Sequence, residues 1–106
     1  MAHIYGLKNC DTCRKALKAI NNSNLVDVRE TPLETAFMSR ALEQFGNALV
    51  NTRSTTWRGL SDEERADDPL SLLMSHPTLM KRPLIEKDGT LYLGWSKDVQ
   101  ADLGVD

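Results

Sequence analysis

The sequence has few of the residues that hold metal ions or cross-link small domains. Its 106 residues include only two histidines and two cysteines, and its net charge is −2 because 15 acidic side chains nearly balance 13 basic ones. A chain without a basic excess lacks the electrostatic footprint of a protein that binds nucleic acid or an anionic membrane. We therefore expect neither nucleic acid nor a membrane among its partners.

Long apolar segments are also missing. No apolar run approaches the roughly 18 residues of a transmembrane helix, and the N-terminus is too polar for a secretion signal. The length suits one domain with one core, so we expect a single domain over 1–106. We also expect the protein to be a monomer located in the cytoplasm. Two cysteines in such a chain indicate redox chemistry rather than a structural disulfide.

Both cysteines lie in one short stretch near the N-terminus. The apolar pair Ile4-Tyr5 leads into a turn over 6–9, and Cys10 follows it. Beyond it, apolar residues recur with the period of a one-faced helix, at Cys13, Ala16, Leu17 and Ile20. The stretch therefore predicts a strand, a turn and a helix, with Cys10 at the N-terminus of that helix.

A cysteine in that position is expected to be reactive. Free backbone N–H groups and the helix dipole favour a thiolate, so the pKa of Cys10 should fall. Lys8, Arg14 and Lys15 add positive charge nearby. Cys13, one helical turn further on, lies on the same side of the helix and within reach of a disulfide. The pair suits a nucleophile and a resolving thiol.

Two other interpretations of the cysteines stay open. The pair could form half of a zinc site, although the isolated His3 and His76 lack the usual ligand spacing, so we expect no metal. Cys13 could also be a small core residue on the buried face of the helix.

The middle of the chain reads as helical. A strand is expected over 25–29, with Val26 and Val28 alternating against charged residues, which completes a βαβ unit. Residues 31–80 then read as a helical insertion, and three signals mark helix starts: a capping box from Thr31 with Pro32, another from Ser61, and Asp68-Pro69.

Strand signals return near the C-terminus. Leu84-Ile85 and residues 91–93 flank Asp88-Gly89, a strong hairpin signal, and Ser96 is suited to cap a last helix. The expected fold is α/β: a thioredoxin-like βαβ…ββα arrangement with a mixed four-stranded sheet. Residues 1–30 and 81–106 form the thioredoxin-like core, and 31–80 form the small helical insertion.

Two motifs resemble one family within that fold. The run IYGLKNCDT at 4–12 is similar to the opening of the ArsC/Spx family, most closely of its YffB-like members, and HPTLMKRPLI at 76–85 resembles the second motif of that family. The resemblance extends over essentially the whole chain and includes the helical insertion.

The resemblance implies roles for individual residues. It makes Cys10 the nucleophile, makes Arg53 and Arg82 ligands of an oxyanion or thiol substrate, and makes Pro83 a cis proline facing the active cysteine. Guanidinium groups can bind an oxyanion through two hydrogen bonds and stabilise a thiolate. Asn9, directly before Cys10, and Arg14, four residues after it, complete the expected binding residues, and Arg14 is expected to act as electrostatic support.

The activity implied is that of a thiol–disulfide oxidoreductase without a bound cofactor. Glutathione is the expected cosubstrate, a small or protein disulfide the substrate, and glutaredoxin a candidate partner. Arsenate reduction is an alternative, but the arginine that follows the fourth strand in arsenate reductases of the family has no counterpart at 93–95. A second alternative is an Spx-like regulator that binds RNA polymerase, with Cys10 and Cys13 as a redox switch.

Overall fold

The structure is a computed structural model that describes residues 1–105. The chain forms two compact units. The first combines Met1–Val28 with the C-terminal stretch that begins at Arg82, and the second is Arg29–Lys81. Within residues 1–105, every helix is too short or too polar to cross a lipid bilayer.

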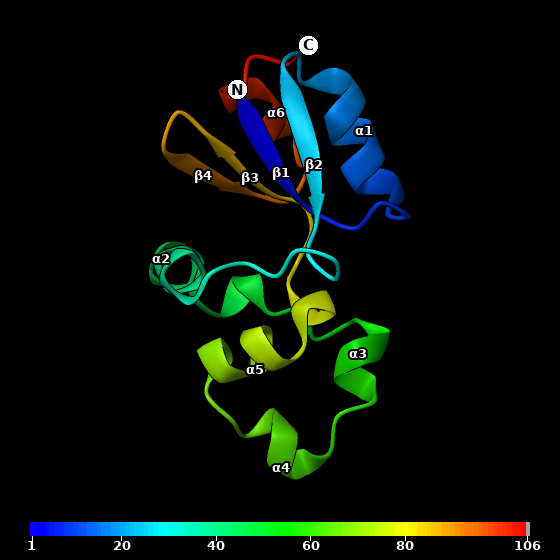
Figure 1. The fold of residues 1–106 in the computed structure, drawn as a ribbon, viewed down its shortest axis with the longest axis vertical. Coiled ribbons are helices and arrows are strands. Elements are labelled where there is room, and N and C mark those ends of the chain that lie inside the picture. Colours follow the sequence, from blue (N-terminus) through cyan, green and yellow to red (C-terminus); the bar gives the residue numbers. More distant parts are fainter. Residues whose placement is uncertain (106) are drawn as a thin grey trace. The chain divides into compact units, whose positions relative to one another are not determined.

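The first unit is built on a four-stranded sheet with the order β2-β1-β3-β4 (Figure 1). β1 (Ala2–Gly6) pairs in parallel with β2 (Ser23–Asp27), and α1 (Asp11–Ala19) connects them. β3 (Leu84–Lys87) pairs antiparallel with both β1 and β4 (Thr90–Leu93), and α6 (Lys97–Asp102) follows. This mixed sheet with its helices confirms the predicted α/β fold class.

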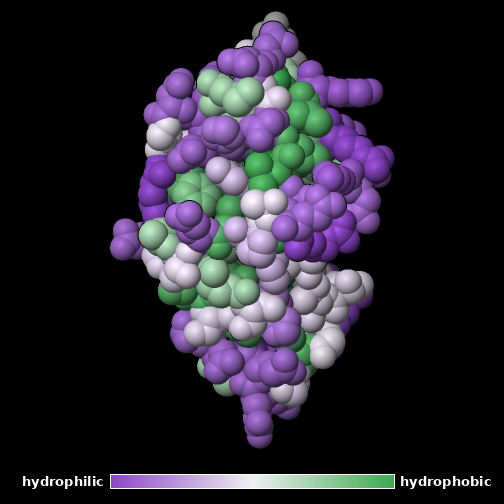
Figure 2. Space-filling model, viewed as in Figure 1, coloured by the Kyte–Doolittle hydropathy of each residue, from purple (hydrophilic) through white to green (hydrophobic). Residues whose placement is uncertain are grey.

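One face of the sheet carries a hydrophobic core that α1 and α6 cover. Its buried residues come from two strands, β1 and β3, and from α1 and the residues that directly follow α1 and α6: Ala2, Ile4, Ala16, Ile20, Ile85 and Leu103. The predicted apolar face of the first helix is buried except at Leu17, which is 36% exposed. In Figure 2 hydrophobic side chains gather over β2 and the adjoining side of α1, while hydrophilic ones cover much of the rest of this unit.

The second strand differs from its prediction. It spans Ser23–Asp27 rather than 25–29, and Asp27 is buried while Val26 is only half-buried. Pairing with β1 sets Leu25 opposite Ile4 and Asp27 opposite Gly6. Paired residues of neighbouring strands point to the same face of a sheet, so Asp27 lies on the face that α1 covers. Pairing, not the local alternation of side chains, decides which residues are buried.

The C-terminal hairpin and its helix cap are confirmed. β3 and β4 are joined by Asp88 and Gly89, with φ angles of 52° and 81°. Positive φ at both positions is the requirement of a type I′ turn, the usual two-residue hairpin connection. The Ser96 hydroxyl accepts a hydrogen bond from the Val99 N–H and so caps α6.

The second unit is helical. Its elements are α2 (Thr35–Phe45), η1 (Gly46–Leu49), α3 (Thr55–Arg58), α4 (Asp62–Arg65), α5 (Pro69–Ser75) and η2 (Pro77–Leu79), where η marks a 3-10 helix. Its buried side chains include those of Met38, Ala41, Leu49, Leu72, Leu73 and Leu79. A single antiparallel bridge between Val50 and Met80 brings the two halves of the unit together.

The helix starts in this unit were predicted with mixed success. Ser61 forms the expected capping box with Glu64, and Asp68 caps α5 with Pro69 at its first turn. The capping box at Thr31 is wrong, because Glu34 is the N-cap of α2 and still has extended backbone angles. A helix cap contributes about 1 kcal/mol to stability. A capping sequence alone therefore does not determine where α2 begins, because the position of the helix also decides the burial of Met38 and Ala41.

Candidate active site

Cys10 stands where the chain leaves β1 and enters α1, as predicted. Its backbone N–H donates to the Leu7 carbonyl at 3.1 Å, which closes a tight turn. Its own carbonyl accepts the first helical hydrogen bond, from the Arg14 N–H at 3.0 Å. Cys10 is thus the N-cap of α1, with an extended backbone and a partly exposed side chain. This position points its thiol toward the unpaired N–H groups of the first helical turn.

The surroundings of Cys10 favour its thiolate. Burial raises the pKa of the Cys10 thiol, but the Cys13 N–H, the Cys13 thiol, the Arg82 guanidinium and the Thr12 N–H together bring that pKa below its usual value. The N–H groups do not reach full hydrogen-bond geometry with the sulfur. Their influence is that of a helix N-terminus on a nearby anion.

Cys13 has the opposite character. It is fully buried, and both cysteines are free thiols. Burial, together with the nearby Cys10 thiol, raises the pKa of Cys13 to about 12, against the lowering effect of the Leu7 backbone and of Arg82. At neutral pH Cys13 therefore carries its proton and is placed beside the Cys10 sulfur.

Gly6 makes room for Cys13. A Cβ atom built on Gly6 would collide with Sγ of Cys13, and it would lie 3.4 Å from Cβ of the same residue. The last residue of β1 therefore has to be glycine for α1 to lie at its present distance from the strand.

Arg82 and Pro83 enter the site from the other direction, just before β3. Arg82 is half-buried, and its Cβ lies 3.9 Å from the Cβ position built on Gly6. The peptide bond between Arg82 and Pro83 is cis, and the Pro83 carbonyl accepts a hydrogen bond from the Gly94 N–H at 2.8 Å. The structure thus brings Arg82, expected from the second motif, to the cysteine pair.

Asn9 and Arg14, the two other expected binding residues near Cys10, are exposed. Asn9 belongs to the turn before α1, and Arg14 lies in the first turns of the helix. The Arg14 Nε donates to the Lys8 carbonyl at 2.8 Å, a contact that the sequence does not reveal. Arg14 is therefore tied to the turn next to Cys10 as well as contributing charge there.

Arg53 belongs to the second unit. It is exposed in the loop before α3, where its N–H donates to the Asn51 side chain at 3.1 Å and its carbonyl accepts from Arg58 at 3.3 Å. Its participation in the site stays a prediction.

Sequence analysis missed Asp27. Its side chain is 4% exposed, and it accepts a hydrogen bond from the Lys8 N–H at 3.0 Å. The strand-end position and the parallel pairing with β1 were the available signals, but charged residues on a half-buried strand are usually taken to face water.

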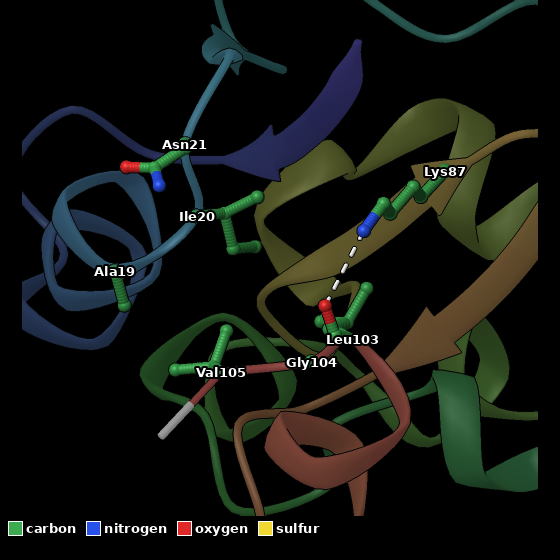
Figure 3. Close-up of a pocket in the computed structure, with 7 residues that line it drawn as sticks. All are labelled: Ala19, Ile20, Asn21, Lys87, Leu103, Gly104 and Val105. Atoms are coloured by element: carbon green, nitrogen blue, oxygen red, sulfur yellow. Dashed lines mark hydrogen bonds between the residues drawn. The ribbon is translucent and has the colours of Figure 1, made fainter.

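A concave feature of the first unit lies at the opposite end of α1 from Cys10. It is a small open hollow beside Ala19 and Leu103, where the Lys87 amino group donates to the Leu103 carbonyl at 3.3 Å (Figure 3). The Lys87 amino group is therefore engaged at the end of α6. Within residues 1–105, no group of three or more histidine, cysteine and acidic side chains is arranged to hold a metal ion.

The site and its fold together define a class. A mixed sheet of order β2-β1-β3-β4, a CxxC pair at the first helix and a cis proline before β3 are the arrangement of a thioredoxin-like protein. The model of the ArsC family matches residues 5–102, so the chain belongs to the ArsC family.

Similar proteins cover nearly the whole chain. An uncharacterised protein of Haemophilus influenzae is 43% identical over 95% of this chain and 97% of its own length. The global transcriptional regulator Spx 2 of Bacillus cereus is 25% identical over 92% of this chain and 82% of its own.

Solved structures agree with this assignment. The protein YffB superposes with a TM-score of 0.87 at 25% identity, over 97% of this chain and 98% of that one. An arsenate reductase (ArsC) related protein from Brucella melitensis has a TM-score of 0.71 at 30% identity, over 95% of this chain and 91% of that one.

Proposed function

We propose that the protein is a glutathione-dependent thiol–disulfide oxidoreductase of the cytoplasm in which Cys10 is the nucleophile. The observation that carries the proposal is the placement of Cys10 at the N-terminus of α1, beside Arg82, with a lowered pKa. A thiolate at neutral pH is the attacking species in thiol–disulfide exchange. In this proposal the protein works as a monomer, without a bound cofactor or metal.

The proposed reaction has two exchange steps. Cys10 thiolate attacks the glutathione sulfur of a mixed disulfide, a bond forms between the two sulfurs, and the substrate thiolate leaves. The thiolate of a second glutathione then attacks the same glutathione sulfur, which releases oxidised glutathione and restores Cys10 thiolate. One glutathione thiol is oxidised for each substrate thiol released, because the other half of the oxidised glutathione comes from the mixed disulfide, so electrons balance. Glutaredoxin is a second candidate for the resolving thiol.

Arg82 supports these steps electrostatically. Its guanidinium lowers the pKa of Cys10, so it favours the thiolate that begins the cycle and leaves at its end. A guanidinium can also bind a glutathione carboxylate through two hydrogen bonds. We extend the second of these roles to Arg53, on the resemblance alone.

Arsenate is an alternative substrate for the same thiol. The similarity to an arsenate reductase related protein supports it, and the residues after β4, Gly94 and Trp95, oppose it because they supply no further arginine. An Spx-like regulatory role is a second candidate, supported by the CxxC pair and by the 25% identical Spx relatives.

The test is turnover of a small glutathione mixed disulfide with glutathione as reductant. The wild type should turn over, Cys10→Ser should lose all activity, and Cys13→Ser should separate two mechanisms. Retained turnover in Cys13→Ser means that glutathione resolves the intermediate, and lost turnover means that Cys13 does. Retained turnover in Cys10→Ser would overturn the proposal.

Two further assays address the alternatives. Oxidation of glutathione that depends on arsenate, and is lost in Cys10→Ser, would assign the arsenate activity. Redox-dependent binding to the C-terminal domain of the RNA polymerase α subunit, in a protein without disulfide turnover, would favour the regulatory role.

A further inference from the structure

A buried carboxylate lies beneath the turn that carries Cys10. Among residues 1–105, Asp27 is the buried residue with a polar or charged side chain, and no buried side-chain nitrogen or oxygen lacks a hydrogen-bond partner. Taking a carboxylate out of water is costly unless strong hydrogen bonds replace the lost hydration. The Lys8 N–H supplies one at 3.0 Å.

A second charged side chain, that of Arg14, binds the other backbone group of Lys8. The Nε of Arg14 donates to the Lys8 carbonyl at 2.8 Å, while Asp27 accepts from the Lys8 N–H. Both bonds join a charged side chain to the backbone, and such bonds are shorter and stronger than neutral ones. The backbone of Lys8 is therefore held between an anion from β2 and a cation from α1.

Lys8 lies inside the turn that sets the position of Cys10. The turn runs from the Leu7 carbonyl to the Cys10 N–H, and the Gly6 carbonyl accepts from the Val28 N–H at 2.9 Å just before it. Because α1 begins immediately after the turn, a displacement of Lys8 moves Sγ of Cys10 relative to the helix N–H groups. A charge interaction of this kind falls off within the first turn of a helix.

We propose that Asp27 and Arg14 are positioning residues that hold the Lys8 turn, and thereby hold the Cys10 sulfur over the N-terminus of α1. The inference rests on the proposed function only in taking Cys10 as the reactive thiol. This positioning role needs no contact between either residue and the substrate. Asp27 acts through the Lys8 N–H, and Arg14 acts through the Lys8 carbonyl.

The alternative is that Asp27 matters only for stability. Asp27→Asn and Asp27→Leu distinguish the two, because both remove the charge at similar size and only asparagine keeps an oxygen that can accept from Lys8. A difference between the variants therefore reports the hydrogen bond and not the charge. Two readouts are needed: the pKa of Cys10 from the ultraviolet absorbance of its thiolate, and its alkylation rate, with the modified residue identified by mass spectrometry.

The expected result is a split between the two variants. Asp27→Asn should alkylate at Cys10 close to the wild-type rate at mildly acidic pH. Asp27→Leu should react roughly three- to tenfold more slowly, which corresponds to a pKa raised by about half a unit to one unit. Equal rates and equal pKa values in the two folded variants would overturn the inference.

Arg14 gives an independent test if Asp27→Leu fails to fold. Arg14 is exposed, so Arg14→Met should fold, and Lys15→Met is its matched control because it removes the same charge one residue further on. Arg14→Met should slow alkylation of Cys10 by a larger factor than Lys15→Met, and equal slowing would show that only charge matters. A wild-type Cys10 that reacts no faster than free glutathione would contradict the proposed function itself, which is a different outcome.

Discussion

Cys10 and Cys13 are one helical turn apart and yet have opposite acid–base behaviour. Cys10 is partly exposed at the helix N-terminus and its pKa is lowered, whereas Cys13 is fully buried and its pKa is raised to about 12. The same chemical group is therefore favoured as a thiolate at Cys10 and as a protonated thiol at Cys13, because the two environments differ. At the scale of single residues, the protonated Cys13 can donate to the anionic Cys10.

Replacing Arg82 should make Cys10 less reactive. The guanidinium lowers the pKa of Cys10, so in Arg82→Met that pKa rises and the thiolate is lost at a higher pH as the solution is acidified. We expect alkylation of Cys10 at mildly acidic pH to slow by roughly threefold or more. The measurement is the pH dependence of the alkylation rate.

Lys18→Met is the control for this prediction. It removes an equal charge from the last turn of α1, away from the thiol. If the two variants shift the pH profile equally, net charge and not the placement of Arg82 sets the reactivity.

At the scale of elements, the contact between β1 and α1 depends on the absence of one Cβ. Gly6→Ala should lower the free energy of unfolding by about 1–3 kcal/mol, because the new Cβ would collide with Sγ of Cys13. Cys13→Ala removes that sulfur, so the double variant should recover part of the loss. Chemical denaturation of the wild type, both single variants and the double variant measures the coupling. Strictly additive effects would show that the collision is relieved elsewhere.

Local chemistry predicts many of these elements, and non-local pairing explains the errors. Ser61, Asp68 and Ser96 cap helices as expected, and Asp88-Gly89 forms its hairpin, because each signal is read within four residues. The burial of Asp27 depends on register with a strand some twenty residues away. The sequence of one strand does not show which residues of its partner lie opposite it, so the sequence of β2 alone does not reveal that Asp27 is buried.

In the candidate site, too, the local features were predicted and the non-local contacts were not. Cys10 at the helix N-terminus was predicted from a turn followed by a helical period, both of which are local. The contacts of Arg14 and Asp27 with Lys8 were not, since they join residues 6 and 19 positions apart through side-chain geometry. Arg53 stays a prediction from resemblance.

At the scale of the whole molecule, each of the two units has fully buried hydrophobic side chains of its own. Leu73 is fully buried in the second unit, and Ile85 is fully buried in the first. Leu73→Ala should cost about 2–5 kcal/mol. We expect amide hydrogen exchange to speed up more in 29–81 than in the sheet, because compact units open separately.

Ile85→Ala should produce the reverse pattern, with faster exchange in the sheet. A uniform increase across both units in either variant would show that they open only together.

The strand order has a consequence for the nascent chain. β1 is made first, yet one of its edges stays unpaired until β3 leaves the ribosome, because the whole of Arg29–Lys81 is translated in between. At about 5–20 residues per second, that edge waits for several seconds. An open strand edge can recruit other chains, so the βαβ segment is exposed to such pairing while the chain is being translated.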